Sequence, residues 1–179
     1  MIDRKESIIK HLHQAFDAVT ELVREADAEM LHAETPERWS VIGHFKHLIL
    51  SAKPVASALK RTDEELARLS VPNGPSRTYE GMIQTYHLVL NAAGGKSTPP
   101  FFPEQLGEMT DEQLIESWLM IRDKLVGRLA AWSEERLEKS GLPHPRMGPL
   151  TMREMMFFTI FHTEHHHANM SRMLIPASS

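Results

Sequence analysis

The sequence predicts an all-α protein, a bundle of four long helices with one additional short helix. Apolar residues recur at spacings of three and four through several long segments, which is the period of an amphipathic helix. The alternation with a period of two that marks a strand is nowhere sustained, so no strand is predicted. The chain has 179 residues and neither an internal repeat nor a low-complexity tract. We therefore expect residues 1–179 to form a single domain around one hydrophobic core.

The first long helix is predicted from Asp3 to about Glu29. Its apolar stripe consists of Ile8, Leu12, Phe16, Val19, Val23 and Ala26. The second long helix is predicted to begin near Ser40, after the segment "AETPERW". At helical spacing it carries Val41, His44, His47, Leu48, Ser51 and Val55. Pro54 lies inside this pattern, and because proline removes a helical hydrogen bond, we expect a kink or an early end there.

The short helix is predicted from about Thr78 to Ala92. The segment "GGKSTPPFFPEQLGE" at 94–108 has the composition of a loop. The third long helix runs from Thr110 to about Trp132. It opens with "TDEQ", a capping box whose side chains accept hydrogen bonds from free backbone N–H groups. Its apolar stripe consists of Leu114, Trp118, Ile121, Leu125, Leu129 and Trp132.

The last long helix follows "HPRMGPL", whose prolines and glycine end any earlier element. It opens at Thr151 with "TMRE", a second capping box, and continues to about Leu174, before Pro176. Helices of this kind form a bundle when each buries its apolar stripe against the others. Trp39 and Trp118 are expected to pack in the core rather than to form platforms for a substrate.

Composition excludes several classes of function. The net charge is -4 with both signs interspersed, so no nucleic-acid partner is expected. The chain has no cysteine, which excludes disulfides, thiolate metal sites and a cysteine nucleophile; any thiol would have to come from a ligand. No serine nucleophile elbow and no glycine-rich phosphate loop is present.

The chain also lacks the signals of secretion and of membrane insertion. The first residues, "MIDRKESIIKHLHQ", are charged and contain no signal-peptide core. The densest apolar run, "MMFFTIF" at 155–161, is far shorter than the roughly 20 residues that span a bilayer. We therefore expect a cytoplasmic protein with no membrane partner.

The histidines of the last helix suggest a metal site. The segment "FHTEHHHANM" at 161–170 places His162 and His166 four residues apart, on the stripe that is expected to face inward. Residues at this spacing lie side by side on a helix, so two imidazoles can reach one metal ion. Buried histidines are costly unless their ring nitrogens find partners, which strengthens this interpretation.

A third ligand is expected from the second helix, where His44 and His47 lie about one turn apart. Periodicity alone does not choose between them. Three neutral imidazoles with an open fourth position would make a Lewis-acid site that activates water or binds an anionic ligand.

Two segments resemble the DinB-like superfamily: "WSVIGHFKHLILSA" at 39–52 and "GPLTMREMMFFTIFHTEHHHANM" at 148–170. The family pattern has a histidine eight residues after the tryptophan, which is His47 here, and an H-x-x-x-H pair, which is His162 and His166. The resemblance implies a DinB-like four-helix bundle in which His47, His162 and His166 hold a divalent metal ion. It thus favours His47 over His44 as the third ligand.

The resemblance also implies a class of activity. Some members are metal-dependent transferases or isomerases that use a low-molecular-weight thiol such as bacillithiol or mycothiol, and members are often dimers. The DinB-like domain of sulfoxide synthases in ergothioneine biosynthesis extends the motif to H-x-x-x-H-x-E. Here Ala168 stands in place of that glutamate, so the resemblance does not extend to their iron- and oxygen-dependent chemistry.

Two hypotheses follow. In the first, the protein is a metal-dependent enzyme in which zinc, or else nickel, iron or manganese, coordinates an external thiol that attacks an electrophilic small molecule; a hydrolase using metal-bound water is a variant. In the second, the protein is a non-catalytic, homodimeric bundle with a structural metal, acting as a stress-associated or interaction module. A carboxylate as fourth ligand would favour the second hypothesis, and an open position facing a pocket would favour the first.

The other polar residues near the motif are given different places. His44 is expected to pack beside the ligands, and His165 and His167 to lie at the flank or surface, with a hydrogen bond of His165 at the pocket edge as the alternative. His87 is expected to be structural, although it also suits the pocket mouth. Glu164 is expected to point outward. Four histidines are expected on the surface: His11, His13, His32 and His144.

Overall fold

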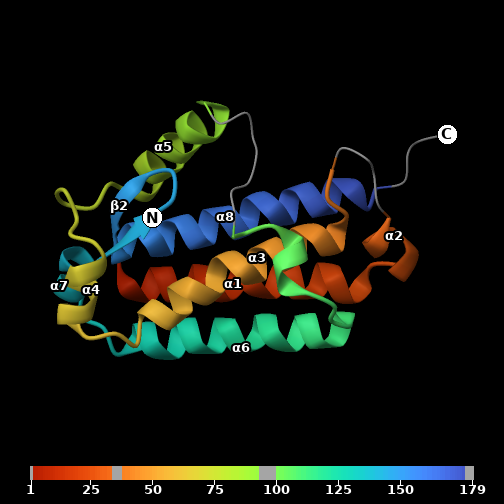
Figure 1. The fold of residues 1–179 in the computed structure, drawn as a ribbon, viewed down its shortest axis with the longest axis horizontal. Helices are drawn as coiled ribbons and strands as arrows, with labels where there is room; N and C mark the ends of the chain where they lie inside the picture. The colour runs from red at the N-terminus through yellow and green to blue at the C-terminus, as the bar shows by residue number, and fades with distance from the viewer. Residues whose placement is uncertain (1, 34–37, 93–99, 176–179) are drawn as a thin grey trace.

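The computed structural model describes residues 2–33, 38–92 and 100–175. Its four long helices lie side by side and form the predicted bundle (Figure 1). In chain order these are α1 (Lys5–Glu25), α3 (Val41–Ala58), α6 (Asp111–Ala130) and α8 (Met152–Met173). Both α1 and α3 pack against α6 and α8. Therefore α1 lies diagonally opposite α3 in the bundle, and α6 lies diagonally opposite α8. The all-α prediction is confirmed.

Side-chain caps start three of the four long helices, α3, α6 and α8, where the sequence predicts. The Thr110 hydroxyl accepts from the N–H of Gln113 while the Gln113 side chain accepts from the N–H of Thr110. Thr151 and Glu154 form the same reciprocal pair at the start of α8. Ser40 caps α3 by accepting from the N–H of Gly43. These bonds satisfy backbone donors that have no partner within a helix.

The core of the bundle is centred on Trp118. Its ring is fully buried and stacks on Phe16 with 3.8 Å between ring centroids. The indole N–H donates to the carbonyl oxygen of Phe16 at 3.1 Å, so the one polar atom of the side chain is satisfied. Trp118 therefore packs as predicted.

One predicted helix end is wrong, and one of two alternatives is excluded. Of the kink or early end expected at Pro54, the early end does not occur: α3 continues to Ala58, because Val55 and Ala56 are buried in the bundle and this burial outweighs one lost hydrogen bond. The first helix stops at Glu25 rather than near Glu29. The reason is Asp27, whose carboxylate accepts from the N–H of Glu29 at 2.8 Å and starts a separate short helix.

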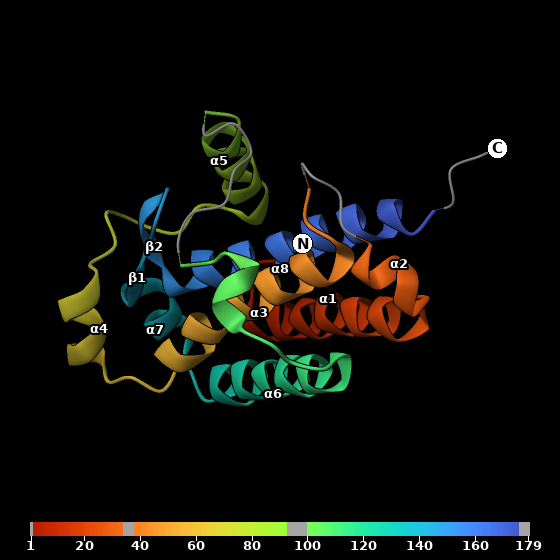
Figure 2. The same cartoon turned by 45° about the vertical axis from the view of Figure 1, so that its right-hand side comes forward.

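Three short helices were not expected. They are α2 (Ala28–His32), α4 (Asp63–Leu69) and α7 (Glu134–Lys139). Each is only five to seven residues long, which is too short to show a helical period in the sequence. The predicted short helix is α5 (Tyr79–Ala92), which packs on α8 and stands away from the other long helices (Figure 2).

The expected loop contains one turn of 3₁₀-helix, η1 (Pro103–Leu106), which packs on α3. Residues 94–99 of that loop lie outside the described residues. The part that the structure describes therefore reaches the bundle and contributes to the site.

A β-hairpin joins α7 to α8, so the prediction of no strand is wrong. Strand β1 (Gly141–His144) pairs antiparallel with β2 (Gly148–Thr151). The ladder places Pro143 opposite Pro149. Because the N–H of Met152 donates to the oxygen of Ser140, ladder bonds recur at every second pair, and the two prolines fall at a pair that needs none.

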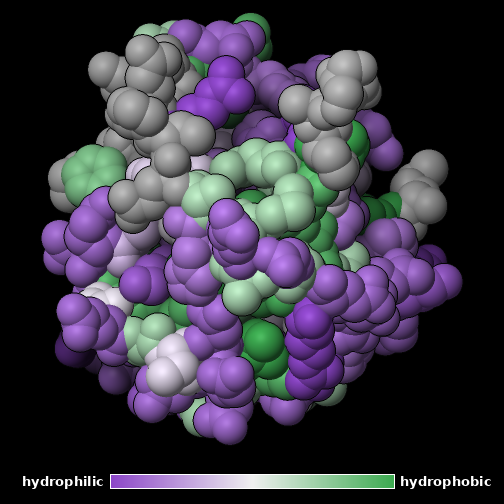
Figure 3. Space-filling view, turned by 90° about the vertical axis from the view of Figure 1, so that its right-hand side faces the viewer, coloured by the Kyte–Doolittle hydropathy of each residue, from purple (hydrophilic) through white to green (hydrophobic). Residues whose placement is uncertain are grey.

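The family resemblance predicts a homodimer. The end of the bundle that carries α2 is mostly hydrophilic, with an apolar patch near its middle (Figure 3). The large apolar side chains that are exposed lie on different elements: Leu69, Val71, Leu88, Met120 and Ile175. The dimer therefore stays a prediction. Among the helices of the described ranges, none is long and apolar enough to cross a membrane.

Candidate metal centre

A cleft of about 1450 Å³ runs along α3 and α8. The hairpin borders it at one end, and the segment at 101–104 lines it beside α3. Aromatic side chains form much of its wall, among them Trp39, Phe101 and Phe158. Such a concave, largely apolar space with a few polar groups is typical of a small-molecule site.

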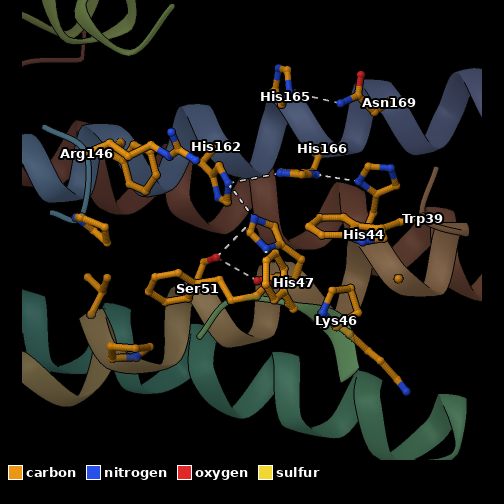
Figure 4. Close-up of a pocket in the computed structure, with 18 of the residues that line it drawn as sticks. Trp39, His44, Lys46, His47, Ser51, Arg146, His162, His165, His166 and Asn169 are labelled. Atoms are coloured by element: carbon orange, nitrogen blue, oxygen red, sulfur yellow. Dashed lines mark hydrogen bonds between the residues drawn. The ribbon is translucent and has the colours of Figure 1, made fainter. Parts of the chain in front are cut away.

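Three buried histidines meet in this cleft (Figure 4). His47 comes from α3, and His162 and His166 come from successive turns of α8. The Nε2 atom of His162 lies 3.1 Å from Nε2 of His47 and 3.2 Å from Nε2 of His166. One ring nitrogen from each residue lies within 4.8 Å of the other two. A buried group of this kind can bind a divalent metal ion.

The backbone orients His47 for such a role. Its Nδ1–H donates to the carbonyl oxygen of Phe101 at 2.7 Å. The neutral ring therefore has its lone pair on Nε2, the atom that faces His162. Histidines that bind metals almost always donate their other ring N–H in this way.

His44 contacts the cluster at the ring nitrogen of His166 that points away from His162. Its Nδ1 lies 2.9 Å from Nδ1 of His166, so one of the two nitrogens donates to the other. This bond leaves Nε2 of His166 directed at His162. The expectation that His44 packs beside the cluster agrees with this contact.

Burial keeps the cluster neutral. His47, His162 and His166 are only 6%, 6% and 7% exposed. Burial lowers the pKa of His47, and it lowers the pKa values of His162 and His166 well below the usual value, with the neighbouring imidazoles adding to the effect. All three rings therefore offer lone pairs rather than protons at neutral pH.

A sequence model described as the DinB superfamily matches residues 11–170. The chain belongs to the DinB superfamily. The match includes all of α3 and α6, most of α1 and α8, and all three histidines of the cluster. The comparison with curated proteins and the comparison with solved structures each gave no match.

His144 is the largest correction to the predicted site of this DinB-superfamily protein. The sequence places it on the surface, but the hairpin carries it into the wall of the cleft, edge-on to Phe158 at 4.6 Å. Burial, with the positive charge of Arg146, lowers the pKa of His144 to about 4. Without the hairpin, whose strands give no alternating pattern, the sequence held no signal for this position.

Trp39 also lies elsewhere than expected. It is half-buried and lines the cleft, with its ring 5.0 Å from His47 and 5.5 Å from His44. It therefore packs at the start of α3 but belongs to the wall of the site rather than to the closed core.

The other predicted surface histidines divide: His32 is exposed, whereas His11 and His13 are half-buried on α1, so their prediction is wrong. Nε2 of His165 lies 3.1 Å from the amide nitrogen of Asn169, and both line the cleft, which is the alternative given for His165. Glu164 is exposed and accepts from the Tyr79 hydroxyl. His87 is exposed and packs edge-on to Phe161 rather than lining the cleft.

Replacing His44 by alanine is expected to weaken zinc binding by about 10- to 100-fold, the usual cost of losing a group that holds a metal-binding histidine. The reason is its contact with Nδ1 of His166. A competition titration with a zinc chelator measures the change. His11→Ala is the matched control, because His11 is half-buried on α1 and bonds its own helix at the carbonyl oxygen of Ser7. Equal affinities for the two variants would contradict the role of His44.

Lowering the pH from 7 to 5 is expected to destabilise the metal-free protein. The pKa values of His44 and His144 fall from 6.5 to about 4 in the fold, so below 6.5 the unfolded chain binds protons that the folded chain does not. Each such histidine removes up to about 1.4 kcal/mol of stability per pH unit. Urea unfolding in the presence of a chelator measures this loss, and a free energy of unfolding that stays constant would contradict it.

Proposed function

We propose that His47, His162 and His166 hold a divalent metal ion and that the protein is a metal-dependent enzyme, transferring a low-molecular-weight thiol to an electrophilic small molecule. The observation that carries the proposal is the cluster itself: three neutral imidazoles converge at the wall of an open cleft. Among the described residues, no carboxylate joins them. A three-ligand set with an open position is typical of catalytic metal sites, whereas structural zinc sites usually have four protein ligands.

The donor set fits a metal ion. A tetrahedral zinc ion bound at about 2.0–2.1 Å separates its ligand nitrogens by roughly 3.3–3.4 Å. The two separations from His162, 3.1 and 3.2 Å, are close to this value, and all three ligand atoms lie within 4.8 Å of one another. Imidazole suits zinc, nickel and iron, so zinc is the first choice and nickel, iron and manganese are alternatives.

The metal ion, an external thiol and the residues of the cleft would have separate roles in the transfer. When bound, the ion would lower the pKa of a thiol and so favour its thiolate. The chain has no cysteine, so the thiol comes from outside. In the transfer the sulfur forms a bond to an electrophilic carbon, the leaving group departs with its electron pair, and the thiol proton passes to solvent. Trp39, Phe101 and Phe158 offer apolar walls that hold the carbon skeleton and exclude water.

The test compares wild type with His166→Ala. Purified, zinc-loaded protein is incubated with a panel of thiols and 1-chloro-2,4-dinitrobenzene, and thiol consumption is followed above the uncatalysed rate. We expect wild type to accelerate the reaction with some thiols and His166→Ala to lose at least about 100-fold of that acceleration. If His166→Ala kept both its metal and its turnover, the proposal would be abandoned.

The same assay tests the alternative of a structural metal. This alternative requires a fourth protein ligand, and the described residues offer no carboxylate or fourth histidine within the cluster. Bound zinc with no acceleration for any thiol, and with hydrolysis of ester substrates instead, would favour the hydrolase variant. Bound zinc with neither activity would favour the structural role, for which a homodimer, detected by light scattering, is expected.

A further inference from the structure

The end of the cleft next to the hairpin contains three polar side chains that the proposed function does not use. His144 and Arg146 come from the hairpin and its turn, and Tyr86 comes from α5. All three line the cleft. Tyr86 precedes His144 and Arg146 by more than fifty residues in the sequence, so only the packing of the hairpin and α5 on α8 brings it to the other two.

The backbone sets the tautomer of His144. The N–H groups of Arg146 and Met147 both lie 3.2 Å from Nδ1 of His144 and donate to it. Because Nδ1 accepts, the neutral ring has its proton on Nε2. His144 is therefore a hydrogen-bond donor in the wall of the cleft.

Arg146 lines the cleft together with both other side chains, and its backbone N–H bonds the His144 ring. Its positive charge adds to the lowering of the pKa of His144 by burial, and it opposes the rise in the pKa of Tyr86 that burial causes. Tyr86 thus keeps its hydroxyl proton at neutral pH. The three residues together present a guanidinium, an imidazole N–H and a phenol O–H, all of them donors.

Phe158 connects these donors to the histidine cluster. Its ring centroid lies 4.6 Å from that of His144 and 5.4 Å from that of Tyr86. It stacks on His162 with 4.9 Å between the ring centroids. In the view of Figure 4, Arg146 lies on the side of His162 opposite to His166 and His44. A ligand held by the donors would therefore extend along the cleft toward the cluster.

The charge of the cleft favours an anion. Among the described residues, one acidic side chain, Glu104, and five basic ones line it: Arg38, Lys46, Arg61, Arg146 and Arg172. The whole chain has the opposite balance, with 20 basic and 24 acidic residues. Clefts lined by one sign of charge raise the local concentration of ligands of the other sign.

We propose that Arg146, His144 and Tyr86 form a subsite that binds the carboxylate of the small-molecule substrate, beside the three-histidine cluster. A guanidinium offers a planar pair of N–H groups that matches a carboxylate, and its single charge balances a monoanion. The inference rests on the proposed function, since it names a substrate class for the same cleft.

The experiment compares an acid with its neutral analogue. Binding of 3-phenylpropionate and of 3-phenylpropionamide to the protein as purified is measured by ligand-observed NMR titration. We expect the acid to bind at least about tenfold more tightly, since hydrogen bonds to charged groups are the stronger ones. Equal binding of acid and amide, or no binding of either, overturns the proposal. Phenyl phosphate is the third ligand, and tighter binding of it than of the acid overturns the choice of a carboxylate.

Variants assign the preference to the three residues. Arg146→Met is expected to remove the tenfold preference, whereas Arg68→Met, which deletes the same charge from an exposed position on α4, is expected to keep it. Tyr86→Phe deletes only the hydroxyl, and His144→Asn keeps an acceptor for the two backbone N–H groups while deleting the Nε2–H donor. Each is expected to weaken acid binding about threefold or more. A preference that survives in Arg146→Met, with its helical circular dichroism unchanged, overturns the proposal.

Repeating the titration with His162→Ala separates this inference from the proposed function. A carboxylate could also bind a metal ion, so the acid preference must persist in this variant, which deletes one of the three imidazoles. If wild type binds no metal but prefers the acid, the subsite stands and the metal site fails. If the preference disappears in His162→Ala, the metal binds the acid and the subsite is wrong.

Discussion

His162→Ala is expected to bind zinc at least about 100-fold more weakly than wild type. Loss of a residue that only supports a metal ligand costs 10–100-fold, so loss of a ligand costs at least the upper end of that range. His162 has the central place, because its Nε2 lies within 3.2 Å of the Nε2 atoms of both other histidines. Chelator competition and elemental mass spectrometry on tag-free protein measure affinity and content.

The control for this variant lies on the same helix. His165→Ala removes an imidazole that lines the same cleft but bonds Asn169 instead of the cluster. It is expected to keep zinc affinity within about threefold of wild type. Equal losses in the two variants would mean that zinc binds to the histidine-rich run as a whole rather than to the three-histidine cluster.

Trp118→Ala is expected to lower the free energy of unfolding by about 3–5 kcal/mol, the range for large aromatic residues removed from a core. The variant loses the stack on Phe16 and one hydrogen bond to its carbonyl oxygen, which still accepts from the Thr20 hydroxyl, and it leaves a cavity in the core. Urea denaturation measures the change. Met120→Ala, at a position 53% exposed on the same helix, is expected to change stability by less than about 0.5 kcal/mol. A loss below about 1 kcal/mol in Trp118→Ala would contradict the assignment of this residue to the core.

The bundle was predictable because its helices are long and carry their own boundaries. The capping boxes at Thr110 and Thr151 form where the sequence places them, and the apolar stripes are buried. The spacing of His162 and His166 on one stripe also translates directly into two rings on one side of α8. These are local properties of a helix, so no tertiary information is needed.

Local sequence patterns did not decide between His47 and His44. Both lie one turn apart on α3, and periodicity alone left them open; the family resemblance favoured His47. The structure adds a physical difference between the two side chains. The carbonyl oxygen of Phe101, 54 residues further along the chain, accepts from Nδ1 of His47, while His44 bonds to the back of His166. Contacts between such distant segments leave no pattern in the sequence.

The hairpin side of the cleft was missed for a related reason. Two prolines in its strands removed the alternation by which strands are recognised, although their place in the ladder makes them harmless. Once the hairpin was missed, His144 was predicted on the surface and Arg146 was given no place in the site. The places of Tyr86 and Trp39 in the cleft wall were not predicted either, since the docking of α5 and of the start of α3 is decided by tertiary packing.

X-ray absorption at the zinc edge tests the central claim most directly. Zinc-loaded wild type is measured alone and with 2-mercaptoethanol, beside His162→Ala. We expect three imidazole ligands in the protein alone and one additional sulfur at about 2.3 Å once the thiol is present, with no such site in His162→Ala. Four protein ligands and no sulfur after addition of thiol, or no bound zinc in wild type, would contradict an open three-histidine metal centre.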